Sequence, residues 1–186
     1  YCSRRNMWEW DSEYGRMEAE ANKFAAFVLM PPDDFREQTG SFVRPTLAEF
    51  EILRERYEVS LTAVVLNWLK TTKCRAMLVV SKEGFIDWSW GSEPLLQSGV
   101  FFKAKQITTP VPARSLAAMG SADGIFEIRH PPGVWHHREP VFESAVFSEY
   151  HDMTLSLLIY PRTGPDRGFR DQEDDEQFLT DDAVWK

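Results

Sequence analysis

The sequence is short of cysteine and has no long apolar run. It holds two cysteines, Cys2 and Cys74, among 186 residues. Two cysteines cannot build a disulfide framework, and these two form no C-x-x-C pair, so we expect a reducing, cytoplasmic compartment. No apolar run reaches the roughly 18 residues that a membrane-spanning helix needs. We therefore expect no association with a membrane.

Positive charge is also scarce. Lys and Arg number 21 against 29 Asp and Glu, which gives a formal net charge of −8. Phosphate contacts need clustered Lys and Arg, so we expect no direct binding of nucleic acid. Seven acidic residues fall between Asp171 and Asp182 alone. Residues 163–186 are therefore predicted to form a flexible, solvated acidic tail rather than a binding arm.

Apolar and aromatic residues are plentiful, at 43% and 13%, and the first third of the chain has a helical period. Residues 11–30 are predicted to form a helix that buries one apolar stripe and ends at Pro31. The stripe consists of Met17, Ala21, Phe24, Ala25 and Val28. Three more helices are predicted at residues 33–38, 47–57 and 61–72. The capping box Thr46-x-x-Glu49 begins the second of these.

After Lys73 the apolar period changes to two, which indicates strands. The predicted strands span residues 76–81, 85–90, 100–107, 125–130, 142–149 and 154–160, with one helical turn at 115–119. Lys82-Glu83-Gly84 predicts a hairpin between the first two. We expect an α+β fold, with a helical portion over residues 1–72, a mostly antiparallel β-sheet over 73–162, and the tail 163–186.

Three groups of residues invite chemistry. Glu20 lies at the edge of the predicted stripe, where it can form a solvated pair with Arg16 or Lys23, or act as a ligand. A second group, around a proline-rich loop, suggests either an exposed loop or a metal site; it consists of His130, His136, His137 and Glu139. Residues 47–69 could form a DNA-reading helix-turn-helix, but their second helix spends most positions on burial, so core support is the favoured interpretation.

The run from Glu20 to Pro31, EANKFAAFVLMP, resembles the E-A-N-x-F-A-x-x-L-L-M-P pattern of the ImmA/IrrE family of zinc metallo-endopeptidases. Val28 stands where that pattern has Leu. Residues 47–69 look like the helical pair that follows the motif, and residues 78–86 are similar to the hairpin that many short members carry next. The resemblance covers residues 8–90 well and the rest of the chain loosely.

The resemblance implies a zincin-like helical portion and a zinc ion held by the two histidines of an H-E-x-x-H helix and by the Glu of the E-A motif, here Glu20. None of the four histidines of this chain belongs to an H-E-x-x-H motif. A catalytic zinc needs three protein ligands and a base, so the chain alone is predicted to hold no zinc, contain no catalytic residue and be inactive. We expect a fragment whose catalytic helix lies upstream of Tyr1.

For the intact protein, the resemblance implies a bacterial, cytoplasmic hydrolase that regulates transcription by cleaving a helix-turn-helix repressor. The alternative is a degenerate member whose β-rich portion is a non-catalytic module that binds a protein or ligand. The sequence gives no oligomeric state.

Overall fold

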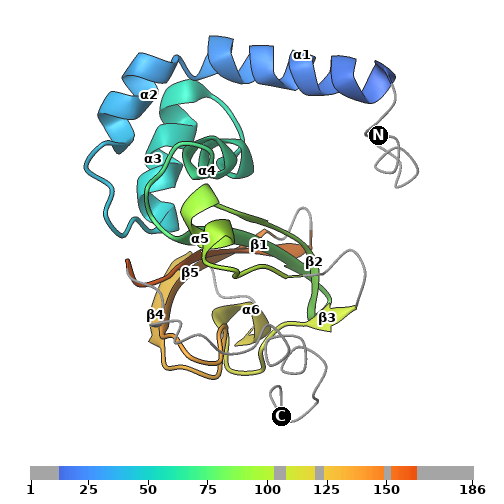
Figure 1. Cartoon of the computed structure of the whole chain (residues 1–186), viewed down its shortest axis with the longest axis vertical. Helices are drawn as coiled ribbons and strands as arrows, with labels where there is room; N and C mark the ends of the chain where they lie inside the picture. Colours follow the sequence, from blue (N-terminus) through green and yellow to red (C-terminus); the bar gives the residue numbers. More distant parts are fainter. Residues whose placement is uncertain (1–12, 103–107, 120–123, 149–151, 163–186) are drawn as a thin grey trace.

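In the part of the chain that the structure describes, four helices precede an antiparallel sheet, and two short helices lie between its strands, which confirms the expected α+β class. A computed structural model describes residues 13–102, 108–119, 124–148 and 152–162, with side chains from residue 20 onward (Figure 1). In this part of the chain no helix is both long and apolar enough to cross a bilayer.

The first four helices begin and end within a few residues of their predicted bounds. They are α1 (Glu13–Leu29), α2 (Pro32–Thr39), α3 (Leu47–Tyr57) and α4 (Leu61–Leu69). The predicted capping box begins α3: the Glu49 carboxylate accepts a hydrogen bond from the Thr46 backbone N–H at 2.9 Å. The Ser60 hydroxyl caps α4 by accepting from the Ala63 N–H. Both caps satisfy N–H groups that a helix start leaves without a helical partner.

The sheet contains six strands in the order β3-β2-β1-β6-β5-β4, and every adjacent pair is antiparallel. The strands are β1 (Ala76–Lys82), β2 (Phe85–Gly91), β3 (Thr109–Pro110), β4 (Ile125–His130), β5 (Val141–Ser148) and β6 (Met153–Ile159). Glu83 and Gly84 both adopt positive φ between β1 and β2. Positive φ at both central residues matches the twist of a two-residue hairpin, as predicted.

The predicted strand over residues 100–107 is wrong in its described part. Residues 100–102 are not in a strand, and 103–107 lie outside the described residues. The short helix α5 (Glu93–Gln97) comes before them, and the strand that pairs with the other edge of β2 is the two-residue β3. The sequence Ser92-Glu93-Pro94 places proline in the first turn of α5, a position that favours a helix start, and no element was predicted over residues 91–99.

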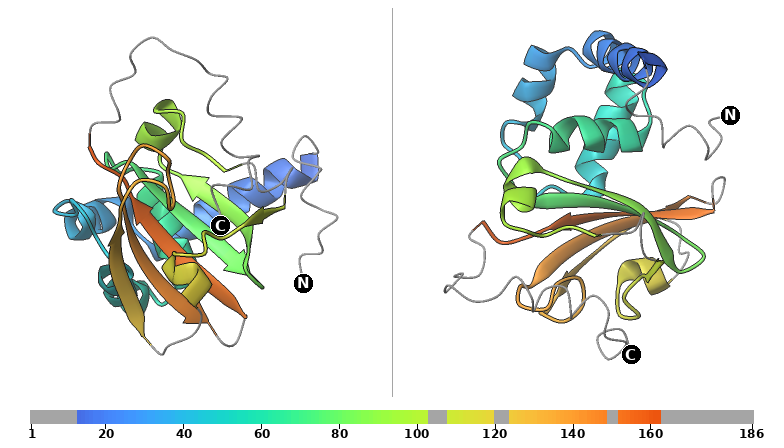
Figure 2. Two further views of the ribbon diagram at one scale, coloured as in Figure 1. Left: turned by 90° about the horizontal axis from the view of Figure 1, so that it is seen from below. Right: turned by 45° about the vertical axis from the view of Figure 1, so that its right-hand side comes forward.

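Helices cover one face of the sheet, and α5, α6 (Leu116–Met119) and loops pack on the other side and edge (Figure 2). The core on the helical face joins α2, α3 and α4 to alternate residues of β1 and β6. Strand β6 sends Leu155 and Leu157 into this core and Leu158 into the core on the opposite face. The core on the helical face therefore joins the helical and β-rich portions, and a second core lies on the opposite face of the sheet.

The apolar stripe of α1 is less buried than predicted. The helix extends along the top of Figure 1, and its contact with the core comes through Ala26 and the following Met30. Ala21, Phe24, Ala25 and Val28, expected to be buried, are exposed instead. The expectation was wrong because a helical period shows which side chains share a face, not whether anything packs on that face.

Candidate functional site

Glu20 is exposed on α1 and shares a helix face with large apolar side chains. Phe24, Phe27 and Val28 stand at i+4, i+7 and i+8 from it, the spacing of one helical face. Their exposed fractions are 72%, 64% and 58%. We call these four residues the outer face of α1. It presents one carboxylate beside three large apolar side chains.

The described residues do not by themselves form a zinc site. Among them, no three His, Cys, Asp or Glu side chains lie together in a way that could hold an ion. Glu20 offers one carboxylate, where structural and catalytic zinc sites use three or four protein ligands. Cys74 is a free, half-buried thiol directed at the Val43 carbonyl oxygen, and Cys2 lies outside the described residues.

The segment of residues 130–139, which we call the histidine loop, is not the exposed loop that its sequence suggested. His130 is buried at the end of β4, and Glu139 is buried as well. His136 and His137 are half-buried, and their rings lie 4.7 Å apart, although adjacent residues on a strand would point in opposite directions. The loop is not a strand, so that alternation does not apply.

Glu143 on β5 is fully buried and accepts hydrogen bonds from five groups. The donors are His130 Nε2 at 2.7 Å, Trp135 Nε1 at 2.8 Å, the Leu116 N–H at 2.9 Å, Ser156 Oγ at 2.9 Å and the Ala117 N–H at 3.3 Å. Burial alone would raise the pKa of Glu143, but these hydrogen bonds outweigh it and lower the pKa below its ordinary value. Through these hydrogen bonds the carboxylate holds α6 and the histidine loop against the sheet, and its burial leaves no space beside it for a substrate.

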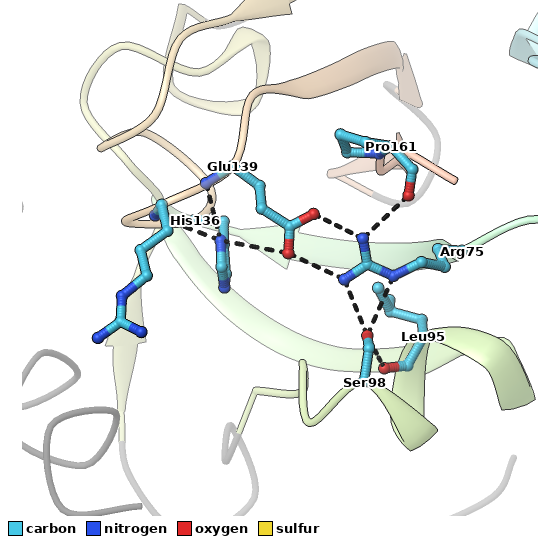
Figure 3. Close-up of polar contacts among 7 residues, drawn as sticks. Arg75, Leu95, Ser98, His136, Glu139 and Pro161 are labelled. Carbon is cyan, nitrogen blue, oxygen red and sulfur yellow. Dashed lines mark hydrogen bonds and ion pairs between the residues drawn. The ribbon is translucent and has the colours of Figure 1, made fainter. Parts of the chain in front are cut away.

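Arg75 and Glu139 form a second buried cluster (Figure 3). The guanidinium contacts both carboxylate oxygens, Nη1 at 2.5 Å and Nη2 at 2.9 Å. It also donates to Ser98 Oγ and to the Pro161 carbonyl oxygen. Arg75 precedes β1 and Pro161 follows β6, so this bidentate pair joins the ends of two neighbouring strands to α5 and the loop. Its geometry is that of a structural clamp.

A groove lined by positive charge lies between the helices and the start of β1. Its larger hollow, about 860 Å³, has an apolar floor that includes Met30, Phe42 and Trp68. A second hollow of about 520 Å³ shares Val43 and Arg162 with it. Seven cationic side chains line the two hollows, which we together call the basic groove: Lys23, Arg36, Arg44, Lys70, Lys73, Arg129 and Arg162. None of the described lining residues is acidic.

Sequence reasoning missed the basic groove and the buried Glu143, and it did not predict that Glu139 pairs with Arg75. The cations of the groove come from α1, α2, the loop before α3, the end of α4, β4 and the end of β6, so no local motif could reveal them. Glu143 is the one acidic residue in a strand of otherwise apolar or small residues, VFESAVFS. A carboxylate inside such a run is a signal of buried hydrogen bonding that could have been used.

No protein-family model matches the chain, and comparison with curated proteins gives no significant match.

Proposed function

We propose that this chain is the part of an ImmA/IrrE-like zinc endopeptidase that follows its H-E-x-x-H helix, with Glu20 as the third protein ligand of the metal. The proposal starts from the resemblance of residues 20–31 to the family motif. The observation that carries it further is the outer face of α1, where Glu20 stands beside three exposed apolar side chains.

The geometry of a zinc site explains why that face would be exposed here. Ligand atoms must lie about 2 Å from the ion, so a helix that carries two histidine ligands has to pack against the side of α1 that carries Glu20. A helix packs through apolar contacts, and the outer face offers Phe24 and Val28 directly beside the carboxylate. A solvated Glu20 on a surface helix would need no such neighbours. The substrate proposed by the resemblance is a helix-turn-helix repressor.

The test is to read the coding sequence upstream of Tyr1 and then to study the longer natural protein. An H-E-x-x-H motif a few tens of residues before Glu20, a bound zinc and cleavage of the repressor encoded nearby would support the proposal. Glu20→Gln should abolish cleavage, whereas Glu37→Gln, an exposed carboxylate on α2, should leave it unchanged. A reading frame that starts near Tyr1 would contradict it.

A second candidate is a non-catalytic module that binds a protein or ligand. The basic groove favours it, because it gathers seven cations over an apolar floor in a chain whose net charge is −8. The two candidates differ in one requirement: the enzyme needs the histidine pair from outside these residues, and the binding module does not.

A further inference from the structure

We propose that the basic groove is the docking site of this chain's own acidic segment, residues 171–182. This inference does not rest on the peptidase proposal, because it gives Glu20 no role; the two proposals share one residue, Phe27, which belongs to the outer face of α1 and also lines the groove. It departs from the expectation drawn from the sequence alone, in which the segment had no surface to bind.

The charges of the groove and the segment are complementary in sign and in number. Seven of the chain's 21 Lys and Arg side chains line the groove. Residues 171–182 contain seven acidic residues and no Lys or Arg. Among the described residues, Arg36 forms an exposed ion pair with Asp33, and Arg44 lies over the Phe142 ring at 4.6 Å. Lys23, Lys70 and Lys73 form no ion pair with any described residue, so their charges are free for an anionic ligand.

The tether places the segment within reach of the groove. Arg162 lines both hollows, and Asp171 follows it by nine residues. Nine extended residues span up to about 30 Å, so the segment begins within about that distance of a groove that Arg162 itself borders. A short tether of this kind gives a local concentration in the millimolar range, so weak contacts suffice for docking.

Apolar side chains of the segment suit the floor of the groove. Phe178 and Leu179 lie between the two clusters of acids. The floor offers Phe27, Met30 and Phe42, of which Phe27 is largely exposed. An acidic segment with a central apolar pair can place carboxylates on the cationic rim and the pair on the floor. A small inorganic anion would leave that floor unused.

Carbodiimide crosslinking of the full chain tests this docking, because it joins a lysine amine to a carboxylate in direct contact. Lys70 and Lys73 should crosslink to residues 171–182 at least about fivefold more than Lys82, an exposed lysine at the β1–β2 hairpin. The crosslinks should disappear at about 1 M salt, where the Debye length falls to about 3 Å. They should be present at about 0.01 M salt, where it is about 30 Å.

Charge reversal supplies the matched comparison. Lys70→Glu with Lys73→Glu should abolish the crosslink from Lys23 to the segment, whereas Lys82→Glu with Arg114→Glu, at exposed sites elsewhere, should leave it intact. Equal crosslinking of Lys82 and the groove lysines would overturn the proposal, and so would the absence of crosslinks. Crosslinks formed only between chains, and rising with protein concentration, would assign the groove to a second copy and would also overturn it.

Discussion

Replacing Glu143 with glutamine removes the charge from the most highly hydrogen-bonded side chain of the sheet while keeping its shape. The carboxylate is fully buried and accepts from five donors. Oε2 faces the Leu116 N–H, and Oε1 faces the Ala117 N–H. Whichever way the amide introduced by Glu143→Gln is turned, its NH₂ group therefore meets a backbone N–H that cannot become an acceptor.

The expected loss is large relative to the stability of a domain. A buried donor left without an acceptor costs about 1–3 kcal/mol, and removing one partner of a buried charged group costs about 3–5 kcal/mol. We expect the free energy of unfolding to fall by about 3–5 kcal/mol and Tm by about 10 °C for a chain of this size. Chemical denaturation with matched m-values measures the change directly.

Glu127→Gln is the control for this experiment. Glu127 lies on the neighbouring strand β4 and is exposed, so the same chemical change there should alter the unfolding free energy by no more than about 0.5 kcal/mol. A loss below about 1 kcal/mol for Glu143→Gln would refute the reasoning, because it would mean that the five donors find other partners at little cost.

Four further outcomes follow from particular side chains. Because folding lowers the pKa of Glu143, ionised Glu143 contributes to the free energy of unfolding above its ordinary pKa of 4.5, and this contribution is lost as pH falls below it. Glu143→Gln should therefore reduce the pH dependence of the unfolding free energy on the acid side. Burial, and then the hydrogen bond to Asp34, raise the pKa of Tyr57 to about 12. Its contribution to the free energy of unfolding should therefore be lost as pH rises from about 10 to 12, and Tyr57→Phe should not show this loss. Tyr160→Phe should leave the unfolding free energy within about 1 kcal/mol or raise it, because the buried hydroxyl has no hydrogen-bond partner among the described residues; a larger loss in urea titration would contradict this. Thr46→Ala, which removes half of the capping box, should cost about 1 kcal/mol in the same assay, and no loss would show that Glu49 alone caps α3.

Local signals carried most of the element prediction. The capping box at Thr46 and Glu49 and the hairpin at Glu83-Gly84 were both confirmed, because each depends on groups only a few residues apart. The period of two predicted after Lys73 is confirmed in β6, because a strand between two cores divides its side chains between them.

What the sequence could not give was the pairing of distant groups. Glu143 obtains its partners from β4, β6, α6 and a loop, and Arg75 meets a carboxylate 64 residues away. The exposure of α1 was not predicted for a related reason: an apolar stripe shows that a helix can pack against a partner, not that a partner is present. The basic groove joins residues from Lys23 to Arg162, and no window along the chain contains them together.

The zinc content of the proposed longer protein tests the central claim most directly. Elemental analysis should find about one zinc per chain in the wild type and in Glu37→Gln, and a small fraction of that in Glu20→Gln, because the site loses one of three protein ligands. After removal of the metal with a chelator, all three proteins should melt at similar temperatures, because bound zinc is the expected source of any difference in stability between them. A Glu20→Gln protein that retains as much zinc as the wild type would contradict the assignment and leave α1 with no metal to hold.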